Sequence, residues 1–177
     1  MTVYTNSDGL VQFYGPRLTN ENAVARQYIN DAGSERSIEI DVEYTHIGSG
    51  ISTFLDQDSN FNGSNDSFSS AHAYIPANAI IVDAKFYVKT AFTSGGAATL
   101  DVGLYAKAGG AIDADGFIAA QAVAGLTANT AIVGAGALAT NDSVGTANAY
   151  IGMTYGTAAF TAGSGRLVVR YVPQRPQ

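Results

Sequence analysis

The feature that most constrains this chain is an alternation from Ile80 to Lys89, with Ile80, Val82, Ala84, Phe86 and Val88 on one side and Asp83, Lys85, Tyr87 and Lys89 on the other. A period of two places alternate side chains on opposite faces, which is typical of a half-buried β-strand. After the loop 93–96, the alternation resumes from Ala98 to Tyr105. We therefore predict that these two segments form one long antiparallel hairpin within residues 71–105.

A second alternation runs from Ser37 to Tyr44, with Ile38, Ile40, Val42 and Tyr44 on the apolar side and an acidic opposite face. The acidic residues are Glu39, Asp41 and Glu43. Like charges on one face repel unless a neighbouring strand supplies the opposite sign. The expected partners are Lys85 and Lys89, or Arg166 and Arg170; the alternative is a simply solvated face.

The C-terminal part predicts a further hairpin. Residues 149–155 alternate, residues 162–165 read as a turn, and Leu167, Val169 and Tyr171 continue the apolar pattern. Shorter signals are a strand within 10–14, core contributions from Ile112, Phe117 and Ile118, and short strands or loop anchors at Ile132, Val133 and Leu138. Residues 21–29 could form a helix of two turns, but nine residues are marginal without tertiary support.

Six to eight strands without a long helix predict an all-β fold, an antiparallel, jelly-roll-like β-sandwich with an irregular N-terminal arm. A closed barrel is the alternative. We expect the arm at 1–36, the sandwich at 37–173 and a tail at 174–177, although residues 1–36 could also belong to the sandwich. The expected core comprises Ile80, Val82, Phe86, Val88, Leu100, Val102, Leu104, Ile151, Leu167 and Val169.

Composition narrows the function. The chain has no cysteine, so disulfides, thiolate metal sites and cysteine nucleophiles are excluded. Its net charge of -6 argues against a nucleic-acid partner, which would require clustered Lys and Arg. No leader or membrane-spanning run of apolar residues is evident, and we expect a protein made in the cytoplasm and not bound to a membrane.

Catalytic patterns are weak. The two histidines, His46 and His72, are far apart in sequence, and neither a nucleophile elbow nor a phosphate-binding loop occurs. Glu39, Asp41 and Glu43 on an exposed strand lack the burial that raises the pKa of a general acid. We expect no enzyme and assign no catalytic, cofactor-binding or metal-binding residue.

The most site-like stretch is 58–63, where Asp58, Asn60, Asn62 and Gly63 match the spacing of a calcium loop. Position twelve is Ser69 instead of the bidentate Glu, so we interpret the loop as a structural turn, with ion binding by residues 58–66 left open. Residues 113–116 likewise read as a turn. Glycan acceptor patterns at 62–64, 65–67 and 141–143 carry little weight without a secretion signal.

Four segments, 75–84, 98–104, 113–118 and 165–172, resemble small virion proteins of tailed bacteriophages, in particular head decoration (cement) proteins. The resemblance implies a β-sandwich on the capsid exterior, bound to the major capsid protein and assembled as a homotrimer, with no functional residue to carry over. Many inward positions are Ala, and such a thin core also favours an oligomer. The alternatives are a carbohydrate- or receptor-binding module of a phage fibre or adhesin, and an enzyme of unrecognised type.

Overall fold

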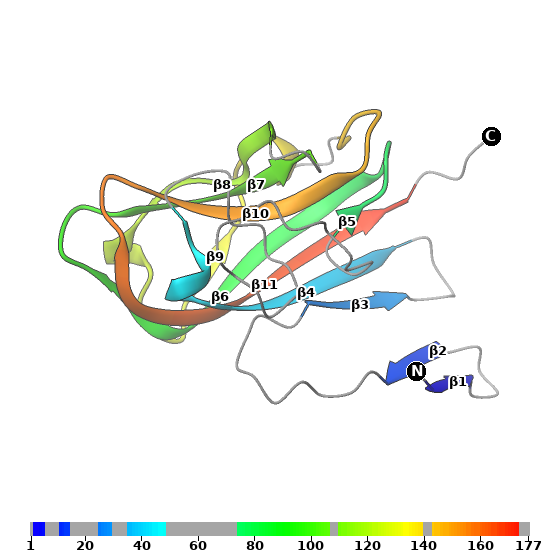
Figure 1. Ribbon diagram of the computed structural model, residues 1–177, viewed down its shortest axis with the longest axis horizontal. Coiled ribbons are helices and arrows are strands. Elements are labelled where there is room, and N and C mark those ends of the chain that lie inside the picture. Colours follow the sequence, from blue (N-terminus) through cyan, green and yellow to red (C-terminus); the bar gives the residue numbers. More distant parts are fainter. Residues whose placement is uncertain are drawn as a thin grey trace.

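The computed structural model describes residues 35–48, 74–106, 110–139 and 143–173, together with the course of three strands before residue 35. Eleven strands and three short 3-10 turns make up these parts of the chain (Figure 1). The strands are β1 Thr2–Thr5, β2 Val11–Tyr14, β3 Ala25–Ile29, β4 Arg36–Glu43, β5 Tyr74–Ile75, β6 Ile80–Ser94, β7 Thr99–Tyr105, β8 Ala111–Ala122, β9 Ala131–Val133, β10 Ala149–Gly156 and β11 Phe160–Val172. The 3-10 turns are η1 Tyr44–His46, η2 Val123–Gly125 and η3 Ala137–Ala139.

Two antiparallel sheets form a sandwich, which confirms the predicted all-β fold. One sheet has the strand order β5-β10-β7-β8, and the other has the order β3-β4-β11-β6-β9 (Figure 1). β1 and β2 pair with each other in a separate hairpin, and β2 covers most of the strand predicted within 10–14. Within the described ranges, no helix has the length and apolar character needed to span a bilayer.

The period-two pattern accounts for most of the core. In β4, Ile38, Ile40 and Val42 are buried while their neighbours are not. Both sheets turn such residues toward the shared layer, because a strand with one apolar face must bury that face against another element. Eight of the ten predicted core positions are buried: Phe86, Val88, Leu100, Val102, Leu104, Ile151, Leu167 and Val169.

The predictions for Ile80 and Val82 are wrong. Ile81 is fully buried, whereas Ile80 and Val82 are only half-buried. Opposite them, Tyr171 pairs with Ile81 and Arg170 with Asp83, so Val82 is an extra residue in β6. A β-bulge of this kind shifts the inward phase of a strand by one residue.

Both predicted hairpins are also wrong. β6 and β7 lie in different sheets, as do β10 and β11, and residues 162–165 lie inside β11 instead of forming a turn. β6 pairs with β11, and β7 pairs with β10. The connection from β6 to β7 and the connection from β10 to β11 therefore run side by side over the same end of the sandwich (Figure 1). Two strands with alternating apolar and polar residues and a short link between them can pair in one sheet or lie in two facing sheets. The sequence pattern is the same in both cases, because each strand buries its apolar face either way.

Side chains join the two connections at this end. The hydroxyls of Thr93 and Thr161 are hydrogen-bonded at 2.9 Å, and the Ser94 hydroxyl donates to the Ala159 carbonyl at 2.8 Å. The ring centroids of Phe92 and Phe160, also from these two segments, lie 5.3 Å apart in an edge-to-face arrangement. Aromatic packing and shared hydrogen bonds therefore hold the paired connections side by side.

Other departures from the predicted pattern occur at element ends. Ile112 and Tyr44, both expected to face the core, are 41% and 37% exposed. Tyr44 leaves the strand pattern because it begins η1, and Ile112 lies where β8 bulges away from β7. Residues 113–116, expected as a turn, lie within β8.

The N-terminal stretch contributes to the sandwich. Residues 25–29, part of the segment considered for a helix, form β3, which pairs with β4 from Ala25–Ile40 to Ile29–Arg36. The described part of residues 1–36 therefore includes both a separate hairpin and an edge strand of the larger sheet. The boundary at residue 36 stays a prediction.

Candidate interaction surface

The outer face of the five-stranded sheet carries ion pairs that cross its central strand, β11. On the β4 side, the Arg166 guanidinium donates to both carboxylate oxygens of Asp41 at 2.7 and 2.9 Å and lies 3.5 Å from Glu39. The predicted cross-strand partner of the acidic face is thus Arg166. Arg166 and Asp41 are about half exposed and Glu39 is about a quarter exposed, so the pairs add little to stability and leave the face strongly polar.

A second group of charges joins β11 to β6. Arg170 donates to both oxygens of Asp83 at 2.7 and 2.5 Å and to Glu35 at 2.9 Å, and Lys85 lies 3.1 Å from Asp83. The hydrogen bonds from Arg170, despite the opposing effect of burial, hold the pKa of Asp83 below its ordinary value. Arg170 therefore pairs with β6 and with Glu35 instead of with the predicted acidic face of β4.

Two exposed apolar side chains adjoin these charges. Tyr87 is 45% exposed and Val133 is 63% exposed. Val133 pairs with Lys85, and Tyr87 pairs with Ala131 on one side and Arg166 on the other, so both lie on the outer face near the β9 edge. A tyrosine and a valine beside charged groups give this part of the outer face a mixed polar and apolar character. The sequence pattern did not single out this pair because it does not show which strand lies beside β6.

The outer face of the four-stranded sheet carries a row of tyrosines. Tyr74, Tyr150 and Tyr105 are aligned across β5, β10 and β7, and the ring centroids of Tyr74 and Tyr150 lie 6.3 Å apart. Tyr105 lies over Gly152, where a Cβ would come within 2.5 Å of the ring. Burial raises the pKa of the Tyr105 hydroxyl, and its hydrogen bond with Thr154 opposes that shift. Tyr105 is only 2% exposed and is therefore covered, whereas Tyr74 and Tyr150 are half-buried.

β8 bulges over this face. Val102 pairs with Ile118 and Leu104 with Asp113, so residues 114–117 stand opposite the single residue Gly103. Burial, together with the neighbouring Asp115, raises the pKa of Asp113. In the part of the chain that the structure describes, no group of three or more His, Asp or Glu side chains could hold a metal ion.

The predicted polar candidates separate in the fold. His46 is buried in η1, where its Nδ1 accepts a hydrogen bond from the Glu43 N–H at 3.0 Å, and Glu43 caps the same turn. Burial lowers the pKa of His46, with the Glu43 carboxylate opposing. Glu39 and Asp41 are engaged by Arg166, so the structure does not group His46 with these carboxylates as a catalytic site.

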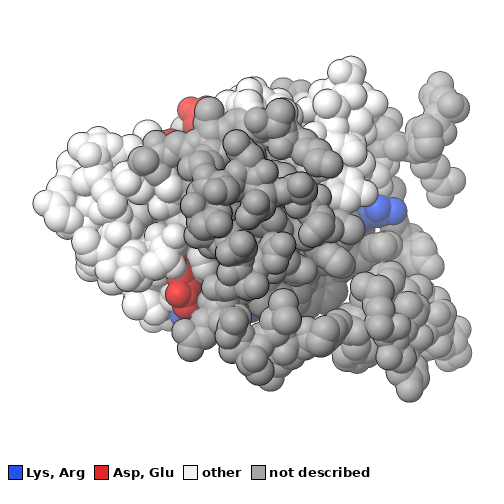
Figure 2. Space-filling model, in the orientation of Figure 1, with Lys and Arg blue, Asp and Glu red and all other residues white. Residues whose placement is uncertain are grey.

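The remaining candidates lie outside the described residues. They are His72, the calcium-like stretch 58–66 with Ser69, and the glycan acceptor patterns at 62, 65 and 141. Their interpretation stays a prediction. Figure 2 shows one face of the molecule, on which a few separate charged side chains of the described part are visible.

Comparison of the chain with protein-family models and with curated protein sequences gives no match. Among solved structures, it is similar to a chain of the capsid of Ralstonia phage GP4, with a TM-score of 0.51 and 17% identity over 84% of this chain and 90% of that one. It also aligns with a chain of the cyanophage Pam1 capsid asymmetric unit, with a TM-score of 0.45 and 16% identity over 96% and 98% of the two chains. At this identity, the first likeness establishes a shared fold, an all-β sandwich that occurs in a phage capsid.

Proposed function

We propose that this chain is a structural virion protein of a tailed phage that binds the outside of the capsid and stabilises it as a decoration protein. The observation that carries the proposal is the sandwich shared, over most of both chains, with a chain of the Ralstonia phage GP4 capsid. The role is one of contact between proteins, not catalysis. Its partner is the major capsid protein.

Two features of the molecule support a contact role. Tyr87 and Val133 present apolar area among the ion pairs of Arg166 and Lys85, which suits a surface that docks on another protein. The core also uses small residues at inward positions, with Ala79, Ala84, Ala98 and Ala149 buried. A core of small side chains buries less apolar area per residue, so contacts between copies would contribute to stability, and we propose a homotrimer.

Binding to heads is the direct test. Heads of the phage that encodes the chain are prepared without this protein, incubated with the purified chain and sedimented. We expect the chain to co-sediment to saturation and to raise the temperature at which the heads open. The matched variants are Tyr87→Ser with Val133→Ser, which should weaken binding, and Thr146→Ser, an exposed position in the loop before β10, as control. Failure to co-sediment with heads would contradict the proposal.

Location and assembly need separate measurements. Antibodies against the chain should label the heads of intact virions in electron microscopy, whereas labelling of tails or fibres would favour the alternative module. Light scattering should give three times the chain mass of 18.3 kDa. A monomer at every concentration would contradict the trimer without affecting the head-binding result.

A further inference from the structure

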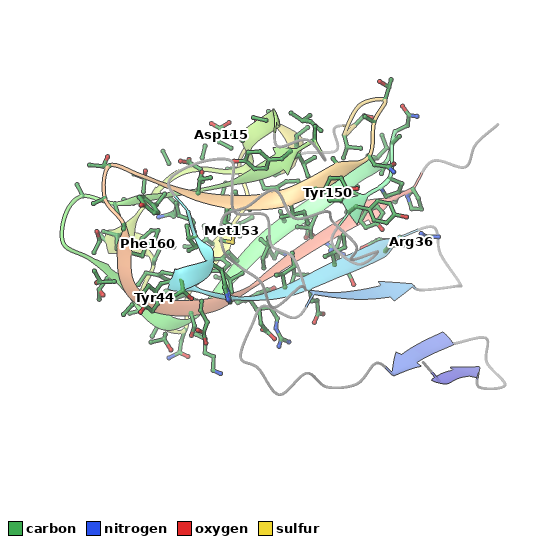
Figure 3. All side chains as sticks on the ribbon, in the orientation of Figure 1. Arg36, Tyr44, Asp115, Tyr150, Met153 and Phe160 are labelled. Atoms are coloured by element: carbon green, nitrogen blue, oxygen red, sulfur yellow. The ribbon has the colours of Figure 1, made fainter. Side chains whose placement is uncertain are left out.

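η1 is the turn by which the chain leaves the five-stranded sheet and reaches the four-stranded one. β4 ends at Glu43, and two residues after η1 Gly48 forms a bridge with Thr154 of β10. The Tyr155 N–H donates to the Gly48 carbonyl at 2.8 Å. In Figure 3, Tyr44 at the start of η1 lies near the same end of the sandwich as Phe160. The turn thus links the two sheets near the end where the paired connections cross.

His46 holds this turn through a reciprocal cap. The Glu43 N–H donates to Nδ1 of His46 at 3.0 Å, and the Glu43 side chain accepts a hydrogen bond from the His46 backbone. The Ile47 N–H closes the turn on the Tyr44 carbonyl at 3.2 Å. A capping box normally uses Glu or Gln at the third position, and an imidazole can take that place only if Nδ1 is unprotonated.

We propose that His46 is an acid-sensitive latch, which holds the turn between the sheets closed while its imidazole is neutral and releases it on protonation. Protonated Nδ1 is a donor, so it would face the Glu43 N–H donor at hydrogen-bonding distance and the cap would be lost. His46 is only 4% exposed, so a charge on its imidazole is poorly solvated while the turn stays closed. This inference does not depend on the proposed function.

Among the residues that the structure describes, the surrounding charges do not remove the conflict. Glu43 is the carboxylate whose field favours protonation, and burial outweighs it, so the pKa of His46 is lowered. From β11, Ser164 stands opposite Glu43, while Arg166 is held by Asp41 and Glu39 on the outer face. From β10, Thr154 and Tyr155 next to Gly48 bring hydroxyl groups and neither a carboxylate nor a cation.

The direction in which stability changes with pH follows from the lowered pKa of His46. In the unfolded chain His46 titrates near 6.5, whereas in the folded protein it titrates at a lower pH. Between these two values the unfolded state binds more protons, so stability falls as pH decreases from about 6.5 and levels off below the folded pKa. Each unit between the two pKa values corresponds to about a tenfold shift in the folding equilibrium.

The test compares thermal melting from pH 7.5 to pH 5 in the wild type and in His46→Asn. Asn can present an oxygen acceptor to the Glu43 N–H but does not titrate, so the variant should lose less stability over this range than the wild type. His72→Gln, which removes the other histidine, should keep the pH dependence of the wild type. Asp113→Asn removes a carboxyl group whose pKa is raised, and so separates its contribution to the pH dependence from that of His46. Equal pH dependence of His46→Asn and the wild type would overturn the proposal.

NMR measures quantities that would not change with pH if His46 had only a structural role. In the His72→Gln variant, the single imidazole should titrate below 6.5, and the exchange protection of the Glu43 and Tyr155 amides should fall as it does so. A His46 pKa at or above 6.5 would overturn the latch, as would unchanged amide protection below that pKa.

Discussion

At the scale of single residues, two glycines determine how closely segments can approach the outer face of the four-stranded sheet. Gly103 and Gly152 pair directly across β7 and β10. Gly152 leaves room for the Tyr105 ring, and Gly103 leaves room for the backbone of Asp113 and Ala114 in the bulge of β8. Both positions require a missing Cβ because of the close approach of a neighbour.

Replacing Gly103 by Ala should be strongly destabilising. The new Cβ would overlap the Asp113 carbonyl oxygen, which belongs to the backbone and cannot rotate away. Overpacking of this kind costs about 1–3 kcal/mol or more. Chemical denaturation followed by circular dichroism measures the free energy of unfolding.

Gly95→Ala is the matched control, because a Cβ at Gly95 meets nothing within 4 Å. We expect it to change stability by less than about 1 kcal/mol. Equal effects of the two substitutions would mean that β8 does not fold over Gly103 in solution.

At the scale of elements, the bulge at Val82 determines which side chains of β6 enter the core. The bulge places Ile81 inward, while the alternation from Ala84 to Val88 agrees with the sequence pattern. The aromatic pair of Phe86 and Phe92, with ring centroids 5.8 Å apart, continues this inward side toward the crossing to β7.

Truncation at the bulge distinguishes the two possible phases of β6. Ile81→Ala should cost about 2–5 kcal/mol, since its side chain is fully buried. Val82→Ala should cost clearly less, because Val82 is half-buried. Denaturant titrations give the free energies of unfolding for the comparison. A larger loss of stability for Val82→Ala than for Ile81→Ala would mean that β6 has no bulge and that Val82 faces the core.

At the scale of the whole molecule, the N-terminal region divides between the edge of the larger sheet and a separate hairpin. β3 covers the edge of β4, whereas β1 pairs only with β2 among the described strands. Removing residues 1–24 should therefore leave the sandwich folded, and if the hairpin grips the capsid lattice, it should weaken binding to heads.

Removing residues 1–34 is the companion variant, since it also deletes β3. It should melt at a lower temperature than the shorter deletion, because the edge of β4 loses its paired strand. If the shorter deletion bound heads as strongly as the wild type, the hairpin would not be the arm that grips the capsid. Equal melting temperatures of the two deletions would contradict the pairing of β3 with β4.

The sequence by itself determined the fold class and most of the core. Alternation depends on local geometry, so the inward residues of β4, the middle of β6, β7 and β11 could be predicted from spacing alone. The same spacing predicted that Arg166 could pair with the acidic face of β4, since a cross-strand partner requires only opposite charge on the same face.

Only the tertiary structure decided which strands are neighbours. Short links after β6 and β10 cross between sheets, and this choice depends on contacts between distant segments, such as Phe92 with Phe160 and Thr93 with Thr161. The same long-range pairing created the bulge at Val82, aligned the tyrosines of β5, β10 and β7, and buried His46 in the turn between the sheets. No local pattern encodes these features, because a two-residue period specifies the face of a side chain but not the strand it will meet.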